Sequence, residues 1–115
     1  MLKVLFVCSQ NQLRSPTAEA VFAGQPGLEV LSAGTNTDAA NPICADLIDW
    51  ADIIFVMEET HRKKLNKMFG SLLREKRLIV LGIPDQYRYM DPDLVEILRK
   101  RVPKHLALGV GGTMR

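Results

Sequence analysis

The sequence predicts an α/β fold: a single domain in which a four-stranded parallel sheet carries helices on both faces. Segments with strand character alternate along the 115-residue chain with segments of helical character, an order typical of a parallel sheet. Residues 2–7 form a short apolar, β-rich run. Residues 53–57 are an uninterrupted apolar run, as expected for a strand that is buried on both faces. The length suits one hydrophobic core. We therefore expect one domain over residues 1–108 and a flexible tail over residues 109–115, where the periodicity ends.

The four strands are expected where short apolar, β-rich runs are bounded by turn residues. Because helical segments separate these runs, we expect the strands to lie parallel to one another. They cover residues 2–7, 28–32, 53–57 and 78–81.

Helices are expected between these strands and after the last one, and three of them begin at a recognisable capping residue. Ser15 caps the first helix, with Pro16 at its first position. Asn41 and Asp91 cap the second and the last. The last helix is amphipathic, and Pro103 kinks or ends it. The expected helices cover residues 16–23, 42–49 and 59–69, and the segment from residue 91 onward.

Composition and charge narrow the class of protein. The net charge of +2 is small and dispersed, which argues against a nucleic-acid partner. No apolar run approaches the ~20 residues of a membrane span, and residues 2–7 lead into a polar loop instead of a signal-peptide cleavage site. Two cysteines favour a reducing compartment over a disulfide framework. We therefore expect a cytoplasmic protein without a membrane partner.

A cysteine and an arginine flank the turn between the first strand and the first helix, in the run Cys8-Ser-Gln-Asn-Gln-Leu-Arg14. The N-terminus of a helix presents unpaired N–H groups and the positive end of the helix dipole, so it binds anions. The guanidinium of Arg14 adds a planar, bidentate partner for the oxygens of phosphate or arsenate. The same positive field favours the nucleophilic thiolate form of Cys8. The motif therefore predicts a phosphoryl-transfer site.

Three segments carry a resemblance to a known family. They are Val-Leu-Phe-Val-Cys-Ser-Gln-Asn-Gln-Leu-Arg-Ser-Pro-Thr-Ala-Glu-Ala-Val-Phe (residues 4–22), Leu-Ser-Ala-Gly-Thr (31–35) and Ala-Asp-Ile-Ile-Phe-Val-Met-Glu (51–58). They are similar to the nucleophile loop, first helix, second strand and third strand of the low-molecular-weight protein tyrosine phosphatase family. The likeness covers most of residues 1–70. It implies a four-stranded parallel sheet that binds phosphate at the carboxyl ends of its strands, and a cysteine-dependent phosphatase.

Each residue of the loop has an expected role in the reaction. Cys8 would attack phosphorus, Arg14 would clamp two equatorial oxygens, and the Ser15 hydroxyl could donate to the Cys8 sulfur. Asn11 suits a left-handed turn, and the resemblance implies that it shapes the loop. Backbone amides supply the remaining contacts, and no metal or other cofactor is expected. The phosphate-binding residues are therefore expected to be Ser9, Gln10, Asn11, Gln12, Leu13, Arg14 and Ser15.

Two aspartates are candidates for the general acid that protonates the leaving oxygen. Asp85 directly follows the fourth strand, whose carboxyl end lies on the functional side of a parallel sheet. Asp91, followed by Pro92, matches the Asp-Pro of the family's acid segment, but the start of a helix already accounts for it. We favour Asp85 and keep Asp91 as the alternative.

The chain departs from the family pattern in two places. Leu13 stands where the family commonly has a second cysteine, so a disulfide inside the loop is impossible. The segment before the third strand is short, so the wall that selects phosphotyrosine is either missing or supplied by an aromatic residue elsewhere. The remaining cysteine, Cys44, is expected to be a small buried residue. The aromatic candidates for the wall are Tyr87, Tyr89 and Trp50, although packing already accounts for Trp50.

Three functions remain open at this point. The first is a phosphatase that hydrolyses phosphotyrosine or a similar phosphomonoester through a phosphocysteine intermediate, with a phosphorylated protein or a small phosphomonoester as its partner. The second is a phosphate-binding or regulatory module with little turnover. The third is a thiol-dependent arsenate reductase, for which only Cys44 could relay the disulfide. His61 and His105 have no Cys or His neighbour at ligand spacing, so neither indicates a metal site.

Overall fold

The computed structural model describes residues 1–106 of the chain, and these contain one four-stranded parallel sheet with the strand order β2-β1-β3-β4. The central strand β1 pairs with β2 on one side and with β3 on the other, so that Val7 lies beside Ala33 and Val56. The predicted α/β fold is confirmed. The predicted end of the domain at residue 108 and the tail over 109–115 lie outside the described residues. The strands are β1 (Leu2–Cys8), β2 (Leu28–Gly34), β3 (Ile53–Val56) and β4 (Arg77–Val80).

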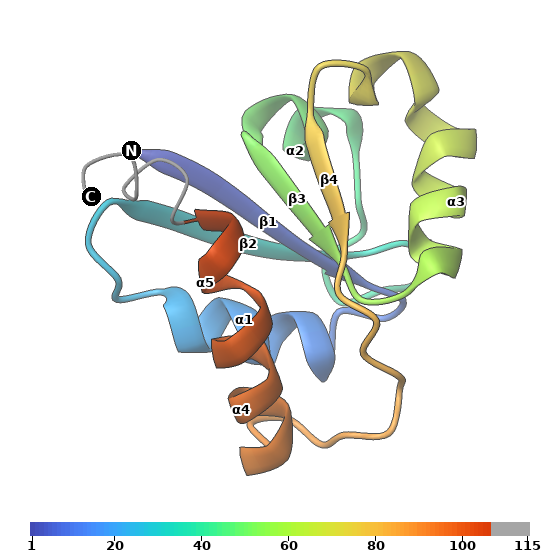
Figure 1. The fold of residues 1–115 in the computed structure, drawn as a ribbon. Coiled ribbons are helices and arrows are strands. Elements are labelled where there is room, and N and C mark those ends of the chain that lie inside the picture. Colours follow the sequence, from blue (N-terminus) through green and yellow to red (C-terminus); the bar gives the residue numbers. More distant parts are fainter. Residues whose placement is uncertain (107–115) are drawn as a thin grey trace.

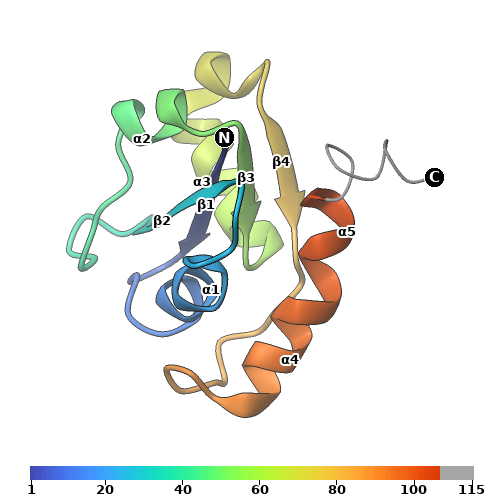
Figure 2. The ribbon, with the colours of Figure 1, turned by 90° about the vertical axis from the view of Figure 1, so that its left-hand side faces the viewer.

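Helices cover both faces of this sheet, as Figures 1 and 2 show. One face carries α1 (Arg14–Phe22), α4 (Pro92–Arg101) and α5 (Pro103–Leu106), and the other carries α2 (Ala45–Trp50), α3 (Glu59–Phe69) and the 3₁₀ turn η1 (Gly70–Leu73). Within residues 1–106, no helix is long and apolar enough to cross a bilayer.

The two cores differ in character because alternate residues of each strand face opposite sides of the sheet. On the side of α1, the ring of Phe6 stacks on those of Phe22 and Phe55, with ring centroids 5.8 and 5.3 Å apart. On the side of α3, aliphatic residues such as Leu5 and Leu65 fill the core. The buried sheet therefore provides a fixed base for the loops that follow its strands.

Two helix starts differ from the sequence prediction. Helix α1 begins at Arg14 with Leu13 at its N-cap, so Ser15 lies inside the first turn and does not cap it. Helix α2 begins at Ala45, because the Asn41 side chain donates to the Ser32 carbonyl and no longer serves as a cap. In both cases a nearby tertiary hydrogen bond uses the side chain that the sequence assigned to the cap.

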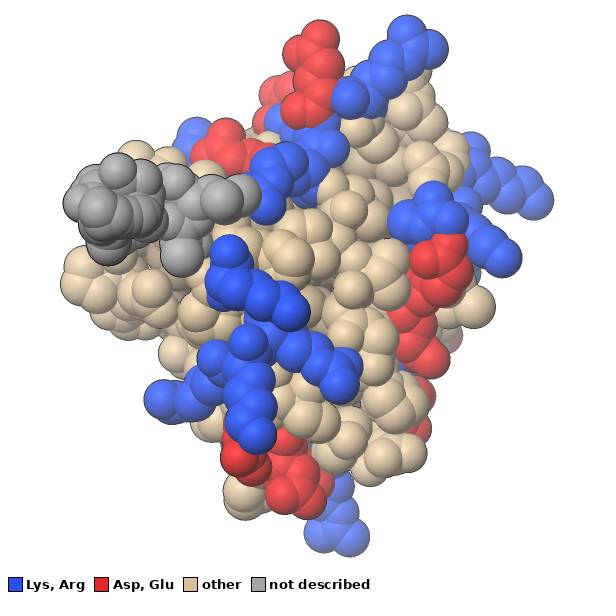
Figure 3. Space-filling view, viewed as in Figure 1, with Lys and Arg blue, Asp and Glu red and all other residues tan. Residues whose placement is uncertain are grey.

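The predicted bounds of α3 and the start of α4 are confirmed. Asp91 Oδ1 accepts a hydrogen bond from the Asp93 amide at 2.9 Å, with Pro92 at the first helical position. Helix α4 ends before Pro103, which begins α5. Basic side chains at the end of α4 and on α5 form the blue cluster over these helices in Figure 3, where they complement the negative end of the α4 dipole.

Candidate active site

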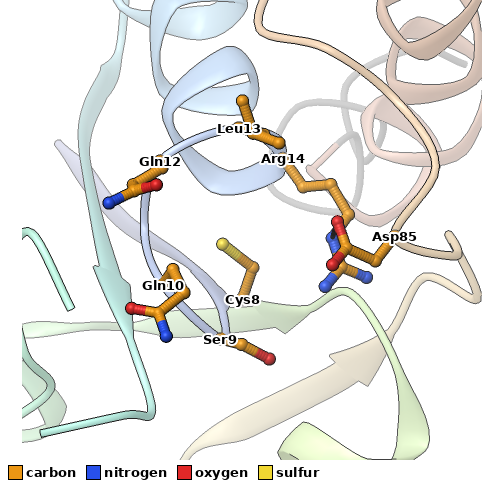
Figure 4. A pocket seen from close by; sticks show the side chains of 7 residues that line it. All are labelled: Cys8, Ser9, Gln10, Gln12, Leu13, Arg14 and Asp85. Atoms are coloured by element: carbon orange, nitrogen blue, oxygen red, sulfur yellow. Dashed lines mark ion pairs between the residues drawn. The ribbon is translucent and has the colours of Figure 1, made fainter. Parts of the chain in front are cut away.

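A small pocket opens where the parallel strands end, which is the edge at which open α/β sheets bind ligands. Its volume is about 230 Å³, below the range of ~300–1,000 Å³ that is usual for ligand pockets. It therefore suits a group the size of a phosphoryl group and the start of its leaving group. Figure 4 shows the residues that line it, which are Cys8, Ser9, Gln10, Gln12, Leu13, Arg14 and Asp85.

Residues 8–15, here called the nucleophile loop, turn their first backbone carbonyl groups away from this pocket. The carbonyl oxygens of Cys8, Ser9 and Gln10 each accept a hydrogen bond from an amide of residues 35–40, at 2.9, 3.0 and 2.9 Å. In a trans peptide the following N–H points the opposite way, so the next three amides face the pocket. Among residues 1–106, no protein group accepts a hydrogen bond from the amides of residues 9–13. The loop thus presents donors to an anion.

Asn11 shapes this loop from inside. Its backbone is left-handed, with φ of 56°, as the sequence predicted, and asparagine tolerates that conformation better than most residues. The side-chain amide donates to Ser15 Oγ and to Ser32 Oγ, both at 2.9 Å. These bonds tie the loop to α1 and to β2.

Cys8 lies at the end of β1 with its sulfur 3.0 Å from Ser15 Oγ. The Ser15 hydroxyl already accepts from Asn11, so its own hydrogen is available for the sulfur or for the Ala33 carbonyl, which is farther away at 3.4 Å. A thiolate can only accept, and the shorter contact suits that role. The predicted contact between Ser15 and Cys8 is present.

Gly34 allows β2 to approach this loop closely. A Cβ atom at this position would lie 2.6 Å from the Ser9 carbonyl oxygen and 2.6 Å from the Ala39 Cβ. Any other residue would push the loop outward, because both neighbours are backbone or close to it. In the sequence this glycine lies within a segment of family likeness, residues 31–35, but no local signal indicates its role.

Arg14 is buried, with 2% of its surface exposed. Its Nη1 donates to Glu58 Oε1 at 2.7 Å and to the Ile83 carbonyl at 2.8 Å. These two bonds orient the guanidinium plane, while Nε lies 3.7 Å from Asp85 Oδ1. Figure 4 shows the guanidinium beside Asp85 at the pocket wall. The edge formed by Nε and Nη2 therefore remains for an anion in the pocket.

The structure separates the two aspartates that the sequence left as candidates. Asp85 lines the pocket, and its side chain is 65% exposed. Asp91 caps α4 and is not among the lining residues. Asp85 is therefore the aspartate that lies within reach of a group bound next to Cys8.

Sequence reasoning missed two residues behind the pocket, Glu58 and His61. Glu58 is the N-cap residue of α3 and binds Arg14, while the buried His61 ring bonds to Ser9 Oγ at 2.9 Å and accepts from the Glu58 amide at 3.0 Å. Burial and the charge of Arg14 lower the pKa of His61 from 6.5 to about 4, although the Glu58 and Asp85 carboxylates oppose this. The spacing of Glu58 and His61, which occupy the N-cap and N3 positions of a capping box, was a signal for the contact between these two residues only, and not for their contacts with Arg14 and Ser9.

The other predicted residues lie away from the nucleophile pocket. Trp50 packs against the aliphatic core, Tyr87 packs against the aromatic one, and Tyr89 is exposed. None of the three lines the pocket. Cys44 was expected to be buried and is exposed, because α2 begins after it and leaves it in an extended segment. Within residues 1–106, no group of three or more His, Cys, Asp or Glu side chains is placed to hold a metal ion.

The chain is similar to known proteins in part of its sequence and in its fold. The sequence model of the family described as "Low molecular weight phosphotyrosine protein phosphatase" matches residues 3–43, which span β1, the nucleophile loop, α1 and β2. No curated protein matches the sequence of the chain.

Solved structures extend the likeness to the whole fold. The YwlE arginine phosphatase of Geobacillus stearothermophilus is 21% identical with a TM-score of 0.75, and the alignment covers 100% of this chain and 99% of that one. The tyrosine phosphatase Wzb of Escherichia coli K30, solved with phosphate, is 21% identical with a TM-score of 0.74, covering 96% and 100%. The low molecular weight protein tyrosine phosphatase SP-PTP of Streptococcus pyogenes is 22% identical with a TM-score of 0.75, covering 93% and 92%.

At these identities the solved structures establish the shared fold, and the family match adds the sequence of the nucleophile loop. The family resemblance stated from the sequence is thereby confirmed. The chain is thus similar to the low-molecular-weight phosphotyrosine protein phosphatases in its overall fold and, over residues 3–43, in its sequence.

Proposed function

We propose that the chain hydrolyses phosphotyrosine or a similar phosphomonoester through a covalent phosphocysteine. The observation that carries this proposal is the position of Cys8, whose sulfur lies under a loop of inward-facing amides and beside the oriented Arg14 guanidinium. This arrangement provides a nucleophile and a binding site for the equatorial oxygens in one pocket. Such a site works by positioning and by stabilising charge.

In the first step, the Cys8 thiolate attacks phosphorus. A bond forms between sulfur and phosphorus, while the bond between phosphorus and the leaving oxygen breaks. Arg14 and the loop amides hold the three equatorial oxygens as charge spreads over them. The Asp85 carboxyl group gives its proton to the leaving oxygen, and its position at the open wall of the pocket suits this role.

In the second step, water attacks the phosphocysteine. The Asp85 carboxylate, left without its proton after the first step, takes a proton from this water. The bond between sulfur and phosphorus breaks, inorganic phosphate leaves, and Cys8 returns to a thiolate that Ser15 Oγ can stabilise from 3.0 Å. One aspartate thus serves as acid and then as base.

Hydrolysis of para-nitrophenyl phosphate, with vanadate as a competitor, tests this proposal. We expect steady-state turnover that vanadate inhibits and that EDTA leaves unchanged. Phosphate binding without turnover would instead show a binding or regulatory module. Arsenate-dependent oxidation of a thiol donor would show the reductase.

The substrate class needs its own comparison, since one relative of similar fold is named an arginine phosphatase and others are named tyrosine phosphatases. A phosphotyrosine peptide and the same peptide with phosphoarginine should be hydrolysed in parallel. We expect the higher kcat/KM for phosphotyrosine. A higher value for phosphoarginine would reverse the substrate assignment and leave the phosphocysteine mechanism in place.

A further inference from the structure

His61 is a buried histidine that the two steps above do not use. It lies in the first turn of α3, with 3% of its surface exposed. Each ring nitrogen makes one hydrogen bond: Nε2 with Ser9 Oγ at 2.9 Å, and Nδ1 with the Glu58 amide at 3.0 Å. The ring therefore joins two segments that are 49 positions apart in the sequence.

These two contacts define the tautomer of the ring. A backbone N–H can only donate, so the Glu58 amide donates to Nδ1, which must be unprotonated. A neutral ring then carries its hydrogen on Nε2, and Nε2 donates to Ser9 Oγ. The low pKa of about 4 agrees with a neutral ring: burial, Arg14 and Lys64 lower the value, and Glu58 and Asp85 oppose them.

The two partners of the ring are linked to different groups of the pocket, Ser9 to Cys8 along the chain and Glu58 to Arg14 by a hydrogen bond. Ser9 follows the nucleophile Cys8, and its hydroxyl points away from the sulfur in Figure 4. Its carbonyl is also held outside the pocket, by the Asn36 amide at 3.0 Å. Glu58 holds the Arg14 guanidinium at 2.7 Å. A displacement of the ring would therefore shift the nucleophile loop relative to the arginine.

We propose that His61 is a positioning residue, whose neutral ring fixes the nucleophile loop against the Arg14 guanidinium through Ser9 and Glu58. The proposal rests on the proposed phosphatase function. His61 lies behind the pocket and is not one of its lining residues. Its effect is therefore expected on the geometry of the transition state more than on substrate binding.

Two substitutions of His61 separate its two hydrogen bonds. His61→Asn places an amide oxygen close to the position of Nδ1, which keeps the contact with Glu58 and removes the one with Ser9. His61→Gln carries an amide nitrogen near the position of Nε2, which can restore the donor to Ser9. Ser9→Ala removes the same bond from the other side. His105→Asn is the matched control, because His105 lies on α5 and contacts Phe55 instead of the pocket.

With para-nitrophenyl phosphate, we expect His61→Asn to lower kcat by about 10- to 100-fold while KM changes by less than about threefold, as for a misplaced catalytic group. His61→Gln should recover much of this loss, and His105→Asn should match the wild type. Ser9→Ala should lower kcat by about as much as His61→Asn does. The double variant should have a kcat no lower than that of the slower single variant. If the double variant lost the product of the two single losses in kcat, or if His61→Asn kept the wild-type kcat, the proposal would be overturned.

The ring itself gives a readout that is independent of turnover. In the full chain labelled with ¹⁵N-histidine at pH 7, we expect the His61 spectrum of a neutral ring protonated at Nε2. A ring protonated at Nδ1, or a cationic ring, would contradict the proposed contacts. If the wild type shows no hydrolysis, the proposed function fails, and vanadate affinity across the same variants still tests the positioning role. If His61→Asn does not fold, Ser9→Ala decides the outcome.

Discussion

The nucleophile loop, residues 8–15, and the acid-bearing segment, residues 82–91, face one pocket but are held in different ways. In the loop, the side chains of Asn11, Arg14 and Ser15 are buried and hydrogen-bonded to protein groups. In the segment, Asp85 is largely exposed, and its contact with Arg14 is an ion pair of 3.7 Å. The groups proposed to bind phosphate are thus held in place by the protein itself, whereas the proposed acid, Asp85, is held only by this longer contact.

This contrast indicates how binding and proton transfer are divided. A phosphoryl group that binds the Nε and Nη2 edge of Arg14 would compete with Asp85, whose Oδ1 lies 3.7 Å from Nε. We therefore expect substrate binding to weaken the contact between Asp85 and Arg14, so that Asp85 can serve the leaving oxygen. Substitutions in the loop should accordingly lower the rate of hydrolysis for every substrate. Substitutions at Asp85 should lower it by an amount that depends on the leaving group.

The largest effect is expected from Cys8→Ser. Loss of the thiolate removes the covalent step, so turnover should fall below detection, while the fold and phosphate binding persist because the amides and Arg14 remain. Steady-state hydrolysis and vanadate affinity measure the two properties separately. Wild-type hydrolysis by this variant would disprove the covalent mechanism.

The rate of alkylation by iodoacetate, with and without phosphate, is a second test of the site at Cys8. An anion bound in the pocket would cover the Cys8 sulfur, so we expect phosphate to protect Cys8 from alkylation. Cys44 is an exposed thiol away from this pocket and serves as the internal comparison. Equal phosphate protection of both thiols would argue against a specific anion site at Cys8.

The acid-bearing segment should show the next effect. Asp85→Asn should slow phosphocysteine formation by about 10²–10⁴-fold for leaving groups of high pKa and much less for activated phenols. Asp91→Asn is the matched control, since asparagine caps a helix nearly as well as aspartate. The measurement is the single-turnover rate against leaving-group pKa. If Asp91→Asn steepens this dependence and Asp85→Asn does not, the assignment of the acid is reversed.

Within the loop, Arg14→Lys should lower kcat/KM by about 10²–10³-fold, because an ammonium cannot hold Glu58 and Ile83 and also present a bidentate edge. Unlike Asp85→Asn, it should do so equally for good and poor leaving groups. Arg74→Lys, on the exposed surface, is the control. If the loss in Arg14→Lys depended on the leaving group, the proposed separation between phosphate binding by the loop and proton transfer by Asp85 would be contradicted.

The smallest effect concerns the stability of the folded chain at acid pH, to which His61 behind the nucleophile loop contributes. The pKa of His61 is about 4 in the folded chain, against an ordinary value of 6.5. Between these values the unfolded chain binds a proton that the folded chain does not, so stability falls as pH decreases from about 6.5 to 4. We expect this linkage to cost about 3 kcal/mol of unfolding free energy.

Urea denaturation at several pH values checks this expectation. His61→Asn lacks the titrating ring, so its difference in stability from the wild type should narrow as the pH falls. His105→Asn is the comparison, since that ring is also shifted to lower pKa, by burial and by the charges of Lys104 and Arg77. A constant difference between the wild type and His61→Asn would show that His61 does not account for the acid lability.

Local sequence signals predicted much of the fold and the front of the site. The apolar runs located all four strands, with errors of one or two residues at their ends, and the charge pattern located α3. Cys8 and Arg14 were recognisable because strand, turn and helix signals surround them within one short segment. Their positions in the pocket follow directly from that local order.

The back of the site depends on contacts between distant segments, which a local pattern does not reveal. Glu58 meets Arg14 across 44 positions of the chain, and His61 meets Ser9 across 52. Gly34 is needed only because β2 passes close to the Ser9 carbonyl. Ser15 was misassigned for the same reason, since its hydroxyl is used by groups of β1 and the loop.

The bond between Arg14 and the Ile83 carbonyl spans 69 positions of the sequence. Arg14 follows the first strand, and Ile83 follows the last, so the guanidinium reaches its working orientation only after the whole sheet has assembled. Phosphate should therefore bind the completed fold and no earlier folding intermediate. By mass action, phosphate then stabilises that fold by RT ln(1 + [L]/Kd). Anion binding thus becomes a reporter of folding, and a chain that ends before β4 would lack the carbonyl that orients Arg14.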